Sequence, residues 1–257
     1  MNKKPYIVAN WKMSLDKISL ERFFDNMDWE NIDLEKINVI LCPSHVFMCK
    51  TRNQIGDKTI GLGAQNIFWE ASGAFTGEVS AKQLVDVGCQ YVIVGHSERR
   101  EIFHETNEVV NLKIVQALKN KLKPIICIGE NFEEKENGLT KKVIEEKLNE
   151  GLQDISPADM RNVLIAYEPI WAISTNKDNT GQADSPESAQ VVHKYIRKLI
   201  SGLYDVRIAE NLPILYGGSI NPENIEGFSK MDDIDGVLIG GASKEASSFQ
   251  KIINTYL

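Results

Sequence analysis

The sequence lacks any apolar run that approaches the ~20 residues needed for a membrane-spanning helix. It also lacks low-complexity tracts, collagen-like repeats and blocks of lysine or arginine, and its formal net charge is -7. These absences argue against a membrane protein, a disordered chain and a general nucleic-acid-binding surface. They do not argue against a local anion site, because a few backbone N–H groups can bind a phosphate inside an acidic protein.

Cysteine is scarce. The four cysteines, Cys42, Cys49, Cys89 and Cys127, form no C-x-x-C pair and have no metal-like spacing with the four histidines. The apolar stretch near the N-terminus is too short for a signal peptide. We therefore expect a reduced protein in the cytoplasm.

Short apolar runs rich in β-branched residues recur along the whole chain. Most are apolar throughout rather than alternating, which is typical of strands buried on both faces. The runs are Tyr6–Asn10, Asn38–Cys42, Thr59–Gly63, Tyr91–Gly95, Pro124–Gly129, Val163–Glu168, Pro213–Gly218 and Gly236–Gly241.

Segments with helical periodicity separate these runs. They cover residues 14–27, 106–122, 139–152, 185–203 and 244–257, and in the fourth Ser185 is expected to be the N-cap, with Pro186 at the first helical position. The charge-rich stretch 131–150 is expected to form a solvated loop and helix face. This alternation predicts a single α/β domain over residues 1–257, a (β/α)8 barrel of eight parallel strands inside a ring of helices. A doubly wound open sheet is the alternative.

The carboxyl ends of barrel strands carry the active site in this architecture. Lys12 follows the first run, His96 follows the fourth, and Glu168 ends the sixth. Glycine turns follow the last two runs, where the fold commonly binds phosphate. An amine, an imidazole, a carboxylate and two glycine turns are therefore expected on one rim.

The sequence resembles the triosephosphate isomerase family over essentially its whole length. The resemblance rests on eight motifs that occur in order. They are Asn10–Met13 (NWKM), Gly63–Asn66 (GAQN), Gly73–Glu78 (GAFTGE), Gly95–Arg100 (GHSERR), Cys127–Glu130 (CIGE), Ala166–Ala172 (AYEPIWA), Tyr216–Ser219 (YGGS) and Asp235–Ala242 (DGVLIGGA).

The resemblance implies a (β/α)8 enzyme that interconverts dihydroxyacetone phosphate and D-glyceraldehyde 3-phosphate without a metal or organic cofactor. Glu168 would be the base that moves a proton between two carbons, and His96 would be the neutral electrophile. Lys12 would supply positive charge to the enediolate and the phosphate. Asn10 would bind substrate oxygens and help to seat Lys12.

The same resemblance assigns the supporting residues. Ser219, Gly240 and Gly241 would bind the phosphate through backbone N–H groups. Glu98 would lie next to Lys12. Cys127 is expected to pack behind the catalytic carboxylate, either with a role there or as an inert buried thiol.

Three aromatic residues, Phe68, Trp69 and Phe75, lie in the stretch after the third run. They could pack on the rim of their own barrel. The family reading is that the Phe68–Thr76 loop inserts into a second subunit near its Lys12 and Glu98, which predicts a homodimer.

The sequence departs from the family pattern in the lid after Glu168, where Ser174–Asp184 is longer than expected. Two alignments remain open. Residues 174–177 (STNK) could stand for the family's G-T-G-K core, which makes Ser174 the predicted phosphate contact. Residues 179–183 (NTGQA) could stand for it instead.

The intact Lys12, His96 and Glu168 favour an active isomerase. Two alternatives stay open: a different phosphosugar-binding barrel, and a catalytically impaired homologue with an altered lid that acts as a binding protein.

Overall fold

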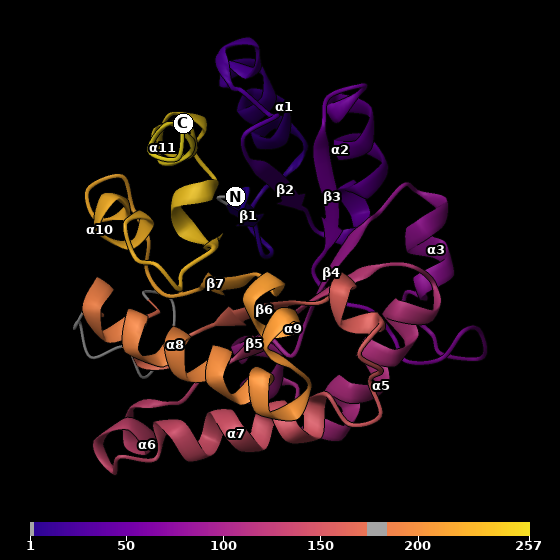
Figure 1. The fold of residues 1–257 in the computed structure, drawn as a ribbon. Helices are drawn as coiled ribbons and strands as arrows, with labels where there is room; N and C mark the ends of the chain where they lie inside the picture. The colour runs from indigo at the N-terminus through magenta and orange to yellow at the C-terminus, as the bar shows by residue number, and fades with distance from the viewer. Residues whose placement is uncertain (1–2, 174–183) are drawn as a thin grey trace.

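The strands of the computed structural model, which describes residues 3–173 and 184–257, close into a barrel (Figure 1). They pair in parallel in sequence order, and β1 pairs with both β2 and β8. The strands are β1 (Tyr6–Asn10), β2 (Asn38–Cys42), β3 (Ile60–Ala64), β4 (Tyr91–Val94), β5 (Lys123–Ile128), β6 (Leu164–Tyr167), β7 (Ile214–Tyr216) and β8 (Gly236–Ile239). The predicted (β/α)8 barrel is confirmed, and the open sheet is excluded.

Helices surround the barrel (Figure 1). The α-helices are α1 (Lys17–Asn26), α2 (Met48–Ile55), α3 (Ala81–Asp86), α4 (Ser97–Ile102), α5 (Asn107–Lys119), α6 (Phe132–Glu136), α7 (Thr140–Gly151), α8 (Pro186–Leu203), α9 (Val206–Asn211), α10 (Ile225–Ser229) and α11 (Ala246–Asn254). Short 3₁₀ turns are η1 (Trp29–Asn31), η2 (His45–Phe47), η3 (Asp159–Asn162), η4 (Ile170–Ala172) and η5 (Gly241–Ser243). The five segments with helical periodicity correspond to α1, α5, α7, α8 and α11.

Each strand except β3, whose inward positions are Gly61 and Gly63, divides its side chains between two cores. Val8 and Ile40 point into the barrel, whereas Ile7 and Ala9 pack outward against the helices. This follows from the two-residue period of a strand, and burial on both faces explains why the runs are apolar throughout. The barrel interior contains Val8, Ile40, Cys42, Tyr91, Ile93, Ile125, Cys127, Leu164, Ala166, Leu215 and Leu238.

Helix α8 begins as its sequence predicts. The Ser185 side chain accepts a hydrogen bond from the backbone N–H of Ser188, and Pro186 occupies the first turn, where its missing N–H leaves no bond unmade. The helix then buries Ala189, His193, Ile196 and Ile200, whose spacing of three or four residues gives one buried stripe along the helix.

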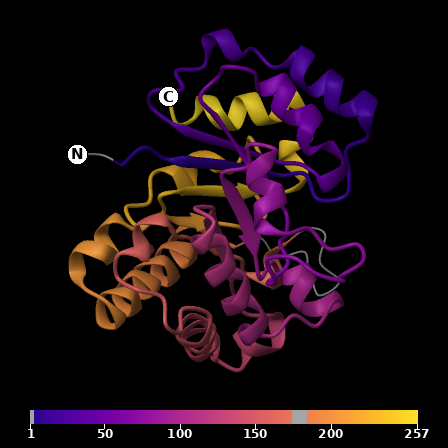
Figure 2. The same cartoon turned by 90° about the vertical axis from the view of Figure 1, so that its right-hand side faces the viewer.

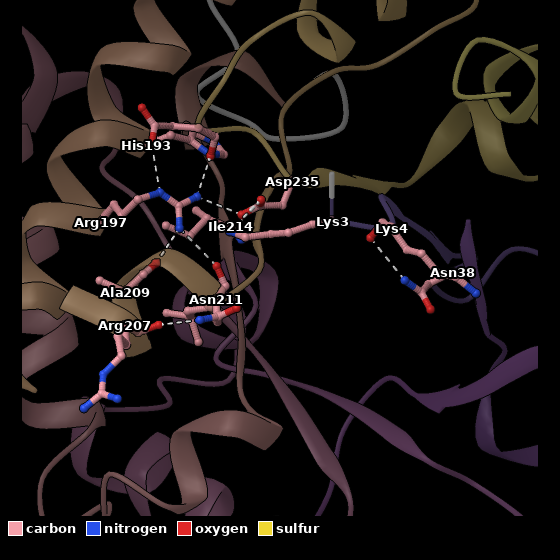
Figure 3. A network of polar contacts seen from close by, with 12 residues as sticks. Lys3, Lys4, Asn38, His193, Arg197, Arg207, Ala209, Asn211, Ile214 and Asp235 are labelled. Atoms are coloured by element: carbon pink, nitrogen blue, oxygen red, sulfur yellow. Dashed lines mark hydrogen bonds and ion pairs between the residues drawn. The ribbon is translucent and has the colours of Figure 1, made fainter. Parts of the chain in front are cut away.

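Arg197 ties α8 to the segment before β8 (Figure 3). Its guanidinium donates to the Asp233 and Asp235 carboxylates, each at 2.8 Å, and to the carbonyls of Ala209 and Leu212. Asp235 also accepts from the Ile214 backbone N–H at 2.9 Å. The cluster lies at the amino-terminal ends of β7 and β8, and therefore at the end of the barrel opposite the predicted site.

The loop after β3 extends beyond the ring of helices in both views of the fold (Figures 1 and 2). Residues 70–78 of this loop are exposed. Among the described residues, no helix is long and apolar enough to cross a membrane.

Candidate active site

One pocket at the carboxyl ends of the strands collects the predicted site residues from loops far apart in the sequence. Of the candidates, Cys127 lies beneath this pocket, Glu98 lies beside it, and Ser174 falls outside the described residues. The pocket is lined by Asn10, Lys12, His96, Glu168, Ile173, Gly217, Gly218, Ser219, Ile220, Leu238, Gly240, Gly241 and Ala242.

Glu168 follows β6 and is held from two sides. Its backbone N–H donates to the Ile128 carbonyl at 2.7 Å, and its Oε2 accepts from the Ser97 backbone N–H at 3.1 Å. The side chain is only 2% exposed, and Oε1 has no hydrogen-bond partner among the described residues. A buried carboxylate oxygen without a partner is unusual, and it belongs here to a residue that lines the pocket.

His96 caps the first turn of α4. Its Nδ1 accepts a hydrogen bond from the backbone N–H of Glu98 at 3.2 Å, so a neutral ring carries its proton on Nε2. That Nε2 lies 3.3 Å from Oε1 of Glu168. The local backbone therefore fixes the tautomer, and it presents an N–H donor beside the carboxylate.

Lys12 has a strained backbone with φ of 49°. Several contacts hold this conformation: the Lys12 N–H donates to Asn10 Oδ1 at 3.1 Å, and its carbonyl accepts from Ser44 Oγ and Gln65 Nε2. Its Nζ lies 2.7 Å from Oε1 of Glu98. Such strain costs about 1–3 kcal/mol and is commonly found at functional positions.

The glycine turns lie beside this amine. A Cβ on Gly240 would come within 3.2 Å of Lys12 Cε. Gly241 opens the η5 turn, whose first N–H groups have no carbonyl partner inside the turn. Together with Ser219, these turns line the same pocket as Lys12, an arrangement that suits an anion.

Cys127 is fully buried in β5, and burial together with the nearby Glu168 carboxylate raises the pKa of its thiol well above the ordinary value. Cys127 therefore lies close to the Glu168 carboxylate. Within residues 3–173 and 184–257, no group of three histidine, cysteine or acidic side chains is arranged to hold a metal ion.

Three contacts in this site escape reasoning from the sequence. They are the Ser97 N–H on Glu168, the Gln65 amide on the Lys12 carbonyl, and the packing of Gly217, where a Cβ would lie 2.8 Å from Glu168 Cγ. Ser97 and Gln65 each stand just after a strand, which is the one signal that could have pointed to them.

A buried carboxylate, an imidazole and an amine at the carboxyl ends of eight parallel strands define an enzyme of the (β/α)8-barrel class. The family model of triosephosphate isomerase matches residues 5–256. The chain belongs to the triosephosphate isomerase family.

Individual relatives agree with this assignment. The triosephosphate isomerases of Endomicrobium trichonymphae and Alkaliphilus oremlandii are each 44% identical to this chain over 98% of its length, and that of Dictyoglomus turgidum is 41% identical over 98%. These alignments cover 98%, 99% and 100% of the respective relatives. The predictions of family and isomerase function are confirmed, and the impaired homologue is disfavoured.

Proposed function

We propose that this protein interconverts dihydroxyacetone phosphate and D-glyceraldehyde 3-phosphate, with Glu168 as the base and His96 as the electrophile. The observation that carries this proposal is that Oε1 of Glu168, buried and 3.3 Å from the imidazole Nε2, has no hydrogen-bond partner within the described part of the chain. A base needs an unoccupied lone pair in a water-poor site, and the oxygen that gains negative charge needs a donor fixed in advance.

The reaction follows from these positions. Glu168 takes a proton from the carbon next to the carbonyl, and the C–H electron pair forms the C=C bond of an enediolate as the carbonyl oxygen gains negative charge. The Nε2–H of His96 stabilises that oxygen, then transfers protons between the two oxygens. Glu168 returns its proton to the neighbouring carbon, so no net proton is consumed. Lys12 and Asn10 stabilise the anionic intermediate.

Phosphate binding falls to the backbone N–H groups of Ser219, Gly240 and Gly241, with the Lys12 ammonium nearby. Ser174 remains a predicted contact from the lid. Glu98 holds Lys12 in place through their ion pair at 2.7 Å. Because the ligands are local dipoles and one amine, the overall charge of -7 does not prevent anion binding.

A coupled assay with purified protein tests the proposal. D-glyceraldehyde 3-phosphate is supplied, and dihydroxyacetone phosphate is measured through a reductase that consumes NADH. Rapid conversion is expected. No conversion, with the fold intact by circular dichroism, would favour a binding protein, and turnover only of other phosphosugars in a parallel panel would favour a different barrel enzyme.

A cytoplasmic homodimer completes the proposal. The four free cysteines support a reducing compartment. The side chains of Met13, Val46, Phe75 and Phe103 are 94%, 82%, 42% and 61% exposed, and they belong to the loops after four neighbouring strands. Exposed apolar side chains gathered on one side of a barrel mark a protein interface.

The occupant of this face is the Phe68–Thr76 loop of a second copy. Within the loop the centroid of the Phe68 ring lies 4.1 Å from that of Trp69 and 4.6 Å from that of Phe75. The three rings therefore form one packed aromatic cluster that can insert as a unit. A cavity of about 430 Å³, lined by Lys12 and Glu98 among others, lies beside it.

Sedimentation of Phe75→Asp tests the dimer, with Val206→Asp on the exposed face of α9 as the matched control. We expect a dimer for the native chain and the control, and a monomer for Phe75→Asp. A monomeric native chain would refute the homodimer.

A further inference from the structure

The backbone of the proposed base rests directly on Gly129, the residue after β5. A Cβ at Gly129 would lie 1.8 Å from the Glu168 carbonyl oxygen and 2.6 Å from its carbonyl carbon. No side chain fits in that space, so the two backbones are in contact. Any shift of Gly129 is therefore transmitted to Glu168.

The residues on either side of Gly129 bind the same segment. The Ile128 carbonyl accepts from the Glu168 N–H at 2.7 Å, and the Glu130 carbonyl accepts from the Ile170 N–H at 3.0 Å. Carbonyls alternate in direction along an extended chain, so that of Gly129 faces away from this segment. It accepts its hydrogen bond from Nζ of Lys147.

Lys147 reaches this carbonyl from the packed face of α7. It is four residues after the buried Val143 and three after the buried Ile144, so it lies on the same helix face. Its side chain runs inward, whereas Lys142 on the same helix is 70% exposed and pairs with Glu146. Lys147 thus links helix α7 to the end of β5, on which the backbone of Glu168 rests.

Charged groups surround this link. Burial, together with the nearby Arg100 cation of α4, lowers the pKa of Lys147 to about 8. Three carboxylates oppose that shift: Glu134 on α6, Glu130 after β5 and Glu168 after β6. An ammonium donates a stronger hydrogen bond to a carbonyl than a neutral group does.

We propose that Lys147 is a positioning residue for Glu168, in that its hydrogen bond fixes the Gly129 carbonyl and, through the backbone contact, the carboxylate of the base. This inference rests on the proposed role of Glu168. Lys147 lies behind the strand ends and does not line the pocket, so it acts on the orientation of the base and not on substrate binding.

Steady-state kinetics of three variants at pH 7 test the proposal. Lys147→Met keeps most of the side chain's length without a donor, and Lys147→Gln keeps an uncharged donor on a side chain of similar length. Lys142→Met is the exposed control on the same helix. We expect kcat of Lys147→Met to fall about tenfold with KM within about twofold, since small misplacements of a catalytic group are costly. Lys147→Gln should be intermediate, and Lys142→Met should match the native enzyme.

Glu168→Gln separates the two proposals. If it is inactive while Lys147→Met keeps the native kcat, the positioning role is refuted and the base role stands. If Glu168→Gln remains fully active, the base role fails, and the positioning role fails with it.

A pH series on Lys147→Gln covers the case in which Lys147→Met does not fold. As the native Lys147 loses its proton around pH 8, its bond to Gly129 becomes as neutral as that of glutamine. The ratio of native kcat to variant kcat should therefore fall toward one between pH 7 and pH 9. A ratio that is constant with pH would overturn the proposal.

Discussion

Nε2 of His96 lies 3.3 Å from Oε1 of Glu168, and the two side chains come from strands that are separated by β5. The contact lacks hydrogen-bond geometry, since Oε1 has no such partner among the described residues. The Nε2 donor of His96 and the Oε1 acceptor of Glu168, which the proposed reaction needs, are thus adjacent but not hydrogen-bonded to each other. Both groups are buried, so small changes at either should affect turnover far more than affinity.

Shortening the base should show this separation. Glu168→Asp withdraws the carboxylate by one methylene, and a displacement near 1 Å costs about a hundredfold in rate. We expect kcat to fall by about that factor while KM changes little. Kinetics of Glu145→Asp, on the exposed face of α7, provide the control. An unchanged kcat in Glu168→Asp would remove Glu168 from the base role.

Replacing the imidazole by an amide should also lower turnover. In His96→Gln the donor survives, but the group cannot move protons between oxygens, and such acid–base steps contribute about 10²–10⁴-fold. A fall of kcat in that range is expected from the coupled assay. Native-like turnover in the variant would mean that His96 transfers no proton.

Two glycine-to-alanine changes should have different effects on kcat. A Cβ on Gly217 would lie 2.8 Å from Glu168 Cγ, so Gly217→Ala should displace the base and lower kcat. A Cβ on Gly202, in the last turn of α8, would meet nothing within 4 Å, and Gly202→Ala should leave kcat unchanged and stabilise the fold by about 0.5 kcal/mol. Kinetics and thermal unfolding measure both. Equal kcat values in the two variants would contradict the packing.

Removal of the Arg197 guanidinium should destabilise the protein without harming the chemistry. Arg197→Met removes the guanidinium from Asp233 and Asp235, which keep only Gln190 and Lys3 as side-chain partners, and breaking such a largely buried pair costs about 3 kcal/mol. Urea unfolding measures the loss, with Arg207→Met, an exposed position in α9, as the control. The folded variant should keep its kcat because the cluster lies at the opposite end of the barrel. Equal midpoints for the two variants would contradict this expectation.

His193 should make stability depend on pH. Burial lowers the pKa of this imidazole to about 4. The unfolded chain, whose histidine titrates near 6.5, binds a proton first as the pH falls, so stability is fully present above pH 6.5 and declines toward pH 4. Between pH 6.5 and pH 5 the native protein should lose about 2 kcal/mol more unfolding free energy than His193→Gln. Parallel pH–stability curves would refute the assignment.

The barrel could be predicted because its strands are marked by their own composition. Runs such as Tyr6–Asn10 are buried on both faces and need no partner to be recognised. Short helices are harder to predict from the sequence. In α2, for example, the buried residues Met48, Thr51 and Ile55 include a polar side chain, and the helix spans eight residues, so its apolar stripe is weak.

The site also contains some features that the sequence predicts and others that it does not. Lys12, His96 and Glu168 could be predicted because each directly follows a strand, and parallel strands deliver their ends to one rim. Contacts between residues that are far apart in the sequence could not be predicted in this way. The expectation that residues 131–150 form a solvated face suits the exposed Glu145 and Glu146, but it is wrong for Lys147, which looks like its neighbours in sequence and differs only in what lies beside it.

The closeness of Lys12 and Gly240 also bears on how the protein is made. These residues follow the first and last strands, and they meet only because β8 closes onto β1. During synthesis the Lys12 amine emerges early from the ribosome, whereas Gly240, part of the proposed phosphate site, emerges almost last. A nascent chain therefore cannot bind substrate until it is nearly complete, and the final strand pairing spans more than two hundred residues, the kind of distant contact that slows folding.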